Sequence, residues 1–344
     1  MNKQDLLSKS KEELIEILRK FNEPKFRANQ IRDWMVERYT SDFSKMRNIP
    51  KELRAKLEKG YSAYPLEVMD VQYANDGTIK FASKTLDEQI VETVIMKYHY
   101  GYSVCVSSQI GCAMECVFCA SAKGGLVRNL TSDEIVAQIL LAQQLIDQRV
   151  SNVVFMGMGE PLNNYNNLLL FLEQCRDEEW GLVIGMRSIT VSTSGLVPQI
   201  RQLALEGYQV TLAVSLHAPN DKIRTRLMPI ASKYSIHDIL DACRFYTEKT
   251  GRRVTYEYLM IKDMNSSLAN AKELANLLRK HIAHINLIPY NPVDFLPWET
   301  PSQEDMLKFA NTLKSAGVTV TIRRELGSEI DAACGQLRNK KSLI

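Results

Sequence analysis

Hydrophobic residues change their spacing along the chain, and each spacing predicts a different kind of structure. In the first 62 residues they recur every three or four positions among charged residues, which is the pattern of amphipathic helices. Phe26 and Trp34 fall on the apolar side of the second such segment and are expected in its core. Residues 1–62 are thus predicted to form an N-terminal helical domain, with short helices over 8–21, 25–39 and 50–57.

Between residues 63 and 100 the apolar positions alternate with polar ones, as they do in β-strands with one buried face. The triplet Asn75-Asp76-Gly77 separates two of these runs. An Asx-Gly pair at such a place is the strongest short-range signal of a β-hairpin. We therefore expect residues 63–100 to form a short antiparallel β connector, with Glu92 in its last strand.

From residue 101 to 330, apolar runs typical of buried strands alternate with helical segments. The runs lie at 103–107, 152–156, 188–192, 210–216, 254–260 and 284–288, and a last strand is expected over 318–323. Six strand–helix units favour parallel strands joined by right-handed crossovers. The sequence therefore predicts an α/β fold with a partial (β/α)6 barrel, and a doubly wound sheet is the alternative. Residues 331–344 are left as a C-terminal segment.

Polar residues follow the predicted strands, where both folds place their binding sites. Taken singly, each such residue is more often a loop cap. Occurring together at successive strand ends, they favour a pocket for a polar ligand. The candidate binding residues are Gly159 and Glu160 after the second strand, Ser192 at the third, Ser215, Leu216 and His217 at the fourth, and Asn291 after the sixth.

Three cysteines follow the first barrel strand with the spacing C-x3-C-x2-C, namely Cys112, Cys116 and Cys119. The chain begins without the apolar core of a signal peptide, so a metal or redox site is favoured over a disulfide framework. Closed zinc sites and closed iron–sulfur clusters take four protein ligands. Three thiols instead suit a four-iron cluster with one iron left for a small chelating molecule. The alternatives are a zinc site completed by His99 or His217, or inert buried cysteines.

Two further cysteines, Cys105 and Cys334, are expected at the same end of the barrel as this group. They could be inert and buried, which is the interpretation given to Cys175 and Cys243 on helical segments. The alternative is that they accept a group covalently and then form a transient disulfide, a reaction that depends on an accessible thiolate.

Charge adds a possible partner. The formal net charge is +3, but residues 1–60 hold 15 Lys and Arg against 10 Asp and Glu, so the excess of positive charge lies in this part. A basic domain is suited to a polyanion, and a solvated helical surface explains the same count. No apolar run of 18 residues is present, so we expect a cytoplasmic protein without membrane contact.

Taken together, several of these strings closely resemble the RlmN/Cfr family of radical S-adenosylmethionine (SAM) RNA adenine methyltransferases. The strings are 23–27, 105–130, 155–162, 212–219, 286–292 and 331–337. The resemblance implies a [4Fe-4S] cluster on the three cysteines and two SAM molecules per turnover. One SAM would methylate Cys334, and the other would yield a 5′-deoxyadenosyl radical that takes a hydrogen atom from that methyl group. The carbon radical would add to adenine, Cys105 would resolve the adduct through a disulfide with Cys334, and Glu92 would accept a proton.

Residues 215–219 and 287–291 resemble the subgroup that methylates adenine carbon 2 in 23S rRNA and in tRNA. That resemblance implies adenine 2503 of 23S rRNA and adenine 37 of tRNA as targets, an electron donor such as flavodoxin or ferredoxin, and a monomer. The alternative within the family is the subgroup that methylates carbon 8 of the same ribosomal adenine and confers antibiotic resistance. An alternative of another class is a non-catalytic iron–sulfur protein that binds RNA.

Overall fold

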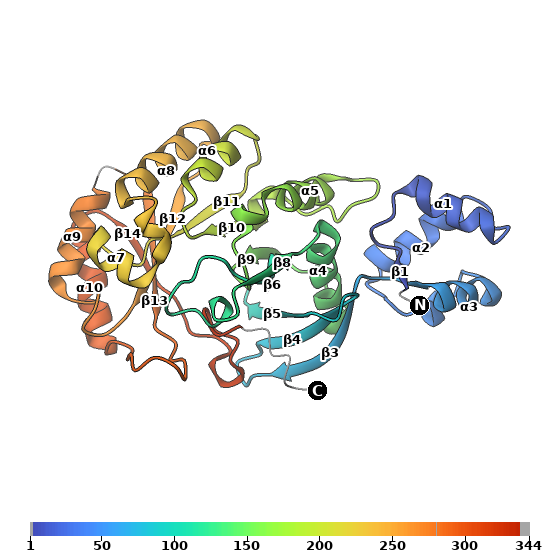
Figure 1. The fold of residues 1–344 in the computed structure, drawn as a ribbon, viewed down its shortest axis with the longest axis horizontal. Helices are drawn as coiled ribbons and strands as arrows, with labels where there is room; N and C mark the ends of the chain where they lie inside the picture. The colour runs from blue at the N-terminus through green and yellow to red at the C-terminus, as the bar shows by residue number, and fades with distance from the viewer. Residues whose placement is uncertain (1–2, 280, 338–344) are drawn as a thin grey trace.

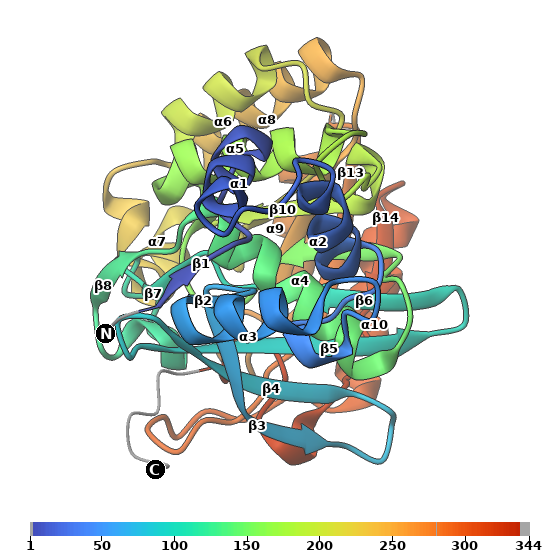
Figure 2. The same ribbon diagram turned by 90° about the vertical axis from the view of Figure 1, so that its right-hand side faces the viewer.

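The computed structural model describes residues 3–279 and 281–337 of the chain. Three helices form the N-terminal domain, and they lie to one side of the remaining chain in Figure 1 and in front of it in Figure 2. A two-residue parallel pair, β1 with β2, brings the beginning and the end of this domain together. The elements are β1 (Gln4–Asp5), α1 (Lys11–Lys20), α2 (Arg27–Val36), α3 (Lys51–Gly60) and β2 (Tyr61–Ser62). The predicted helices are therefore confirmed to within a few residues.

Phe26 is a correction to the expected core of this domain. Trp34 packs partly buried against the apolar core, but Phe26 is 53% exposed. Phe26 immediately precedes the first residue of α2, where the chain has not yet turned its apolar side inward, and the Arg27 guanidinium covers its ring at 4.8 Å. The apolar face of α2 therefore does not include Phe26.

The N-terminal domain contacts the rest of the chain through a buried arginine. Arg32 Nε donates to the carbonyl of Trp180 at 2.9 Å, and Arg32 Nη1 donates to the carbonyl of Leu7 at 3.0 Å. Its guanidinium also lies 5.1 Å from the centre of the Trp180 ring. A side chain that bonds carbonyls from both parts fixes the domain against the loop that follows helix α5 (Tyr165–Arg176).

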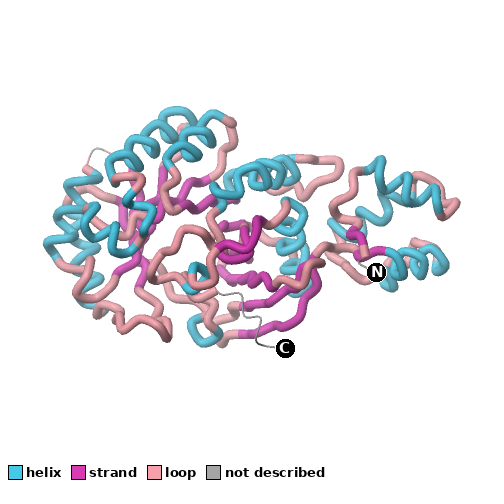
Figure 3. Tube along the Cα trace, viewed as in Figure 1, coloured by secondary structure: helices cyan, strands magenta, loops and turns pink. Residues whose placement is uncertain are grey.

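One ten-stranded sheet forms the centre of the molecule; its strands are magenta in Figure 3, and the cyan helices of the barrel lie along its outer side. Its parallel part consists of consecutive neighbours, as expected for repeated strand–helix units. These strands are β6 (Gly101–Cys105), β9 (Asn152–Phe155), β10 (Ile189–Thr193), β11 (Thr211–Ser215), β12 (Val254–Met260), β13 (Ala283–Pro289) and β14 (Thr319–Ile322). The sheet is open, with β14 and β3 at its edges, so the partial barrel is confirmed.

The antiparallel segment continues the same sheet, because β5 pairs with β6 in the order β3-β4-β5-β6. Its strands are β3 (Leu66–Tyr73), β4 (Ile79–Thr85) and β5 (Ile90–Tyr98). Gly77, in the predicted hairpin turn, has φ +84°, a backbone conformation that favours glycine. The connector thus adds three antiparallel strands to the sheet beside β6.

Helices cover the outer side of the curved sheet (Figure 1), and their apolar faces form one continuous core with the strands. They are α4 (Ser132–Ile146), α5, α6 (Val197–Leu205), α8 (Ile236–Thr250), α9 (Leu268–Leu278) and α10 (Gln303–Ser315). The short helix α7 (Asp221–Leu227) and the hairpin of β7 (Gln109–Gly111) with β8 (Leu126–Asn129) were not predicted, since each is too short to show a period. Within the described residues, no helix is both long enough and apolar enough to span a bilayer.

Candidate active site

The carboxyl ends of the parallel strands surround a cavity of about 150 Å³. Most of the residues singled out by the strand-end rule line this cavity together with the three clustered cysteines. Those from the prediction that do so are Cys112, Cys116, Cys119, Gly159, Glu160, Ser192, Ser215, His217, Asn291 and Cys334. Cys105 lines a neighbouring cavity, while Leu216 and Glu92 line neither.

The cysteine loop is closed at its base by the β7–β8 hairpin. Cys112 N donates to the carbonyl of Gly125 at 3.0 Å, and a Cβ atom on Gly111 would overlap that same carbonyl. Gly111 also has φ +73°, so this position requires glycine for two reasons. Inside the loop, Cys119 N donates to the carbonyl of Cys116 at 3.1 Å. The three cysteines therefore lie in an irregular loop that backbone hydrogen bonds hold in shape, and not on a helix or strand.

Burial raises the pKa of all three thiols. The pKa of Cys112 rises to about 12, and neighbouring sulfurs add to the effect of burial at Cys112 and Cys116. Among residues 3–279 and 281–337, no three His, Cys, Asp or Glu side chains already converge as the ligands of one metal ion do. Bound iron would supply the positive charge that holds such thiols as thiolates.

The rest of the cavity wall suits a polar ligand beside such a cluster. Asn291 Oδ1 is buried and has no hydrogen-bond partner among residues 3–279 and 281–337, and Ser194 and Tyr290 add hydroxyl groups to the same wall. Buried polar atoms are nearly always paired in folded proteins, so the Asn291 oxygen is available to a bound molecule. Three thiols and this set of polar atoms fit a four-iron cluster with a chelating molecule at its open iron.

Glu160 organises the loops after β9 and β10. Its Oε2 accepts from Ser194 N at 2.6 Å and its Oε1 accepts from Leu162 N at 3.1 Å, while burial raises its pKa. Each carboxylate oxygen retains capacity for another donor. At Gly159, with φ +98°, a Cβ would meet the Gln109 side chain at 2.6 Å, so glycine lets this loop pack against β7.

His217 lies in the cavity wall as a neutral ring. Burial, and then the Arg224 guanidinium, lower its pKa to about 3. Its Nδ1 accepts from Leu259 N at 3.0 Å, which places the remaining proton on Nε2. The ring stands edge-on to Phe118 in the cysteine loop, with centroids 5.0 Å apart. The neighbouring Leu216 is fully buried in the core, since the chain turns between the two residues.

Neither histidine considered for a zinc site is placed as a ready fourth ligand. His99 is exposed in the turn between β5 and β6 and is in edge contact with Tyr100, away from the lining of either cavity. His217 does line the larger cavity, but its Nδ1 is already engaged by the backbone.

A second, smaller cavity of about 30 Å³ adjoins the first and contains the other pair of thiols. Cys105, at the end of β6, and Cys334 both line it, and Cys334 also lines the larger cavity. Burial raises the pKa of Cys105 to about 12, and Cys334 adds to the rise. The structure therefore brings together two thiols that are 229 positions apart in the sequence.

Glu92 lies on β5 beside this region and is buried. Its Oε1 is 3.6 Å from Lys80 Nζ, and Lys80 Nζ in turn donates to the carbonyl of Asp331 at 3.4 Å. Glu92 is thus connected to the C-terminal segment through a buried lysine, and it is not among the residues that line the cavity of the three clustered cysteines.

Three charged residues of the site were missed by sequence reasoning. Arg323 directly follows β14, so the strand-end rule applied to the last strand would have found it. Glu257 lies within the apolar run of β12, where a carboxylate is itself a signal of function. Arg224 is fully buried on α7, and its Nη2 donates to the carbonyls of Ser194 at 2.6 Å and Ser215 at 3.2 Å. It ties the ends of β10 and β11 together.

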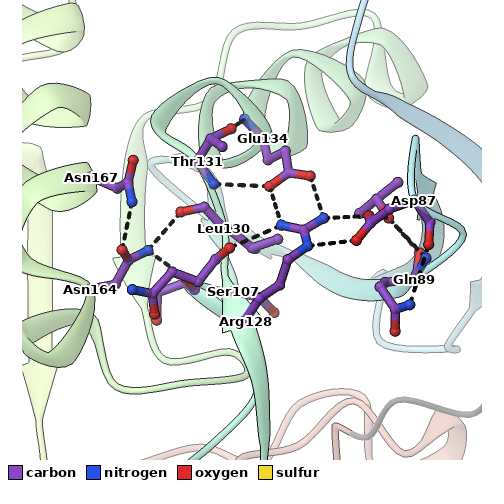
Figure 4. A network of polar contacts seen from close by, with 12 residues as sticks. Asp87, Gln89, Ser107, Arg128, Leu130, Thr131, Glu134, Asn164 and Asn167 are labelled. Carbon is purple, nitrogen blue, oxygen red and sulfur yellow. Dashed lines mark hydrogen bonds and ion pairs between the residues drawn. The ribbon is translucent and has the colours of Figure 1, made fainter. Parts of the chain in front are cut away.

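A further network anchors the outer end of the cysteine loop (Figure 4). Arg128, on β8, donates from Nε and Nη2 to Asp87 at 2.8 and 2.6 Å, and from Nη1 and Nη2 to Glu134 at 2.8 Å each. Glu134 also accepts from Thr131 N, completing a capping box at the start of α4. One guanidinium therefore joins the hairpin beside the cysteines to α4 and to the turn before β5.

Comparisons with known proteins agree with this geometry. Residues 106–278 match the radical SAM superfamily, and residues 4–62 match the ribosomal RNA large subunit methyltransferase N-terminal domain. A radical SAM methyltransferase from Sphaerobacter thermophilus has a similar structure, with a TM-score of 0.90 and 45% identity, covering 97% of this chain and 99% of that one. The fold and the cysteine loop thus define a radical SAM enzyme, a class that uses a [4Fe-4S] cluster and SAM.

The sequence relatives narrow this class. The chain is 49% identical to a probable dual-specificity RNA methyltransferase RlmN of Clostridium perfringens, with 97% of this chain and 96% of that protein covered. It is also 49% identical to the protein of the same description from Alkaliphilus oremlandii, with 99% of each covered. The chain belongs to the RlmN family of radical SAM RNA methyltransferases, and the resemblance inferred from its motifs is confirmed.

Replacement of a clustered cysteine should remove the cluster and leave the fold intact. In Cys119→Ser we expect most of the iron and acid-labile sulfide to be lost, because a serine hydroxyl is a poor substitute for a thiolate ligand. The measurement is iron and sulfide analysis of anaerobically purified protein. Cys243→Ala, a buried change on α8, is the control and should keep the wild-type metal content. Zinc in place of iron in the wild-type protein would contradict the assignment.

Loss of the Arg128 network should destabilise the protein more than loss of a surface ion pair. We expect Arg128→Met to lower the free energy of unfolding by about 2 kcal/mol, since Glu134 is left buried without its partner. Urea unfolding gives this value. Arg244→Met breaks an exposed pair with Asp241 and should change it by less than about 0.5 kcal/mol. Equal effects of the two changes would show that the network carries no special weight.

Proposed function

We propose that this protein transfers a methyl group to carbon 2 of adenine in 23S rRNA and in tRNA, with Cys334 as the carrier of that group. The observation that carries the proposal is the position of Cys334, which lines both the cavity of the three clustered cysteines and the cavity of Cys105. A thiol that receives a methyl group beside the cluster and is later released by Cys105 must reach both cavities. The dual specificity named for the relatives supports both RNA targets.

Cys112, Cys116 and Cys119 would hold the cluster, and polar atoms of Ser194 and Asn291 would contact SAM at its open iron. When bound, these groups supply a methyl group from one SAM and a 5′-deoxyadenosyl radical from a second. Adenine carbon 2 is electron-poor and does not react with SAM by polar attack, so it requires chemistry that a cofactor provides.

The remaining steps belong to side chains of this protein. Cys334 would accept the methyl group, lose one of its hydrogen atoms to the 5′-deoxyadenosyl radical, and become joined to the adenine carbon through the remaining methylene, with one electron returned to the cluster. The Cys105 sulfur would then attack the Cys334 sulfur: the disulfide forms as the bond from Cys334 to the methylene carbon breaks, and that carbon keeps the electron pair, takes up a proton and leaves as the methyl group of the base. Glu92 would accept the proton that the adenine carbon loses; it is buried on β5, with its Oε1 3.6 Å from Lys80 Nζ.

The adenine must be unstacked to reach these thiols, which suits an RNA loop. A groove on the N-terminal domain offers contacts for the rest of such an RNA. It has a volume of about 690 Å³, and its lining carries basic and polar side chains around one indole ring, with Arg38 lying 4.6 Å from that ring. The lining residues are Trp34, Arg38, Ser44, Lys45, Arg47 and Asn48. Cationic side chains beside an aromatic ring suit RNA phosphates and bases.

Reduction of the cluster requires a one-electron donor, for which flavodoxin or ferredoxin is suited. One chain carries the cysteine loop and both further thiols, so we propose that the protein acts as a monomer. Its RNA targets imply that it works in the cytoplasm.

The position of the new methyl group tests the proposal directly. Protein with a reconstituted cluster is incubated anaerobically with SAM, a reductant and a 23S rRNA fragment, and the modified nucleoside is identified by mass spectrometry. We expect 2-methyladenosine and release of 5′-deoxyadenosine. Cys334→Ala is the control and should give no methylated RNA. Methylation at carbon 8 would assign the protein to the other subgroup, and absence of 5′-deoxyadenosine would indicate a non-catalytic RNA-binding protein.

Removal of the resolving thiol should trap the reaction halfway. In Cys105→Ala we expect RNA to remain covalently attached to the protein through Cys334, because no second thiol can displace it. Denaturing gels with labelled RNA measure the adduct, and peptide mass spectrometry locates it. The double change Cys105→Ala/Cys334→Ala should show none. Free RNA and unmodified protein from the single variant would reject the disulfide step.

A further inference from the structure

Arg323 lies where the two cavities meet, and its side chain lines both. Its backbone N–H donates to the carbonyl of Leu287 at 2.8 Å, so the residue continues the pairing of β14 with β13. Its Nη1 donates to Cys334 Sγ at 3.1 Å and lies 3.7 Å from Met156 Sδ. The guanidinium is therefore held by the sheet and directed at the sulfur of the carrier thiol.

A buried carboxylate accompanies this arginine. Glu257, on β12, is 4% exposed and accepts a hydrogen bond from Asn286 Nδ2 at 2.8 Å. Negative charge on Cys334, and secondarily on Glu257, raises the pKa of Arg323, so the guanidinium remains protonated despite its burial. Arg323 thus has two acidic neighbours, of which one is the thiol that changes during the reaction.

The two thiols of the smaller cavity differ in their surroundings. Burial is the largest influence on Cys105, and it raises the pKa of that thiol to about 12 although Arg323 opposes the rise. Cys334 is only partly buried and receives a hydrogen bond directly from the guanidinium. A hydrogen bond from a guanidinium fixes the position of the sulfur and strengthens as negative charge develops on it during nucleophilic attack.

We propose that Arg323 is a positioning residue: its hydrogen bond holds the Cys334 sulfur at the junction of the two cavities, directed for attack on an alkylating group. The pairing makes Cys334, rather than Cys105, the thiol that is alkylated first. The role of SAM as the alkylating group rests on the proposed function. The hydrogen bond between Arg323 and Cys334 is a property of the protein without RNA.

The step is balanced without an oxidant or a reductant. The thiol proton leaves to solvent, and the Cys334 thiolate attacks the methyl carbon of the sulfonium. The sulfur–carbon bond forms as the bond to the sulfonium breaks, and the electron pair stays with the leaving thioether. The negative and positive charges cancel. Arg323 then faces a neutral thioether and keeps its electrostatic interaction with the buried Glu257.

Alkylation by iodoacetamide tests the pairing without SAM or RNA. Full-length protein from iron-limited cells, whose Cys334 has not been methylated, is reconstituted anaerobically with iron and sulfide. Peptide mass spectrometry then follows the labelling of each cysteine. In the wild-type protein we expect Cys334 to react at least about tenfold faster than Cys105. Arg323→Gln should slow Cys334 about tenfold, and Arg323→Lys, which keeps the charge, should retain most of the rate.

Arg253→Gln is the matched control. It removes an exposed arginine just before the first residue of β12, at the end of the sheet away from the cavities, and should leave the Cys334 rate unchanged. If Arg323 only supported the fold, Arg323→Gln would loosen the core and speed the labelling of buried Cys175, and would not slow Cys334 alone. The inference is overturned by equal rates for Cys334 and Cys105 in the wild-type protein, which needs no variant to fold. It is also overturned by equal loss in Arg323→Gln and Arg323→Lys. Neither result bears on which adenine carbon is methylated.

Discussion

The site depends on a short set of hydrogen bonds between the cysteine loop and the C-terminal segment. Ala120 N donates to the carbonyl of Gly335 at 2.8 Å, and Ser121 Oγ donates to the carbonyl of Leu337 at 2.6 Å. Gly335 has φ +85°, a conformation that side chains disfavour, and this turn presents its carbonyl to the loop. These contacts join segments that no secondary structure connects. They place Cys334 beside the cluster cysteines and beside Cys105 at once.

The antiparallel strands also help to hold the C-terminal part of the chain in place. The β3–β4 hairpin holds residues 327–331, at the start of the C-terminal segment, from the other side: Gly327 N donates to Asp76 Oδ2 at 2.8 Å, and Lys80 Nζ donates to the carbonyl of Asp331. The segment therefore lies between this hairpin and the cysteine loop, as the neighbouring red and blue ribbons of Figure 1 show. The strands that extend the sheet past β6 therefore support the segment that contains Cys334, and a half-barrel of parallel strands alone would not.

The regular part of the fold was predictable because its signals are local. Long apolar runs located the strands, and the rule that ligands bind at strand ends found most of the larger cavity. The same rule included Leu216, although its side chain points into the core. It was not applied to the last strand, and so it missed Arg323. The pairing of Cys105 with Cys334 came from family resemblance, since no local pattern specifies a contact across 229 positions. Glu257 and the Arg128 network likewise depend on tertiary packing.

The size of the smaller cavity constrains how RNA reaches the thiols. Its volume of about 30 Å³ is enough for about one water molecule, so adenine does not fit between Cys105 and Cys334 as they lie. The C-terminal segment packs with a small apolar cluster that includes Val94 and Leu337 and is separate from the main core. A segment attached in this way can open locally while the barrel stays folded. On the proposed function, the base therefore reaches Cys334 from the larger cavity, which that sulfur also lines, and a local movement of this segment widens the smaller cavity that contains Cys105.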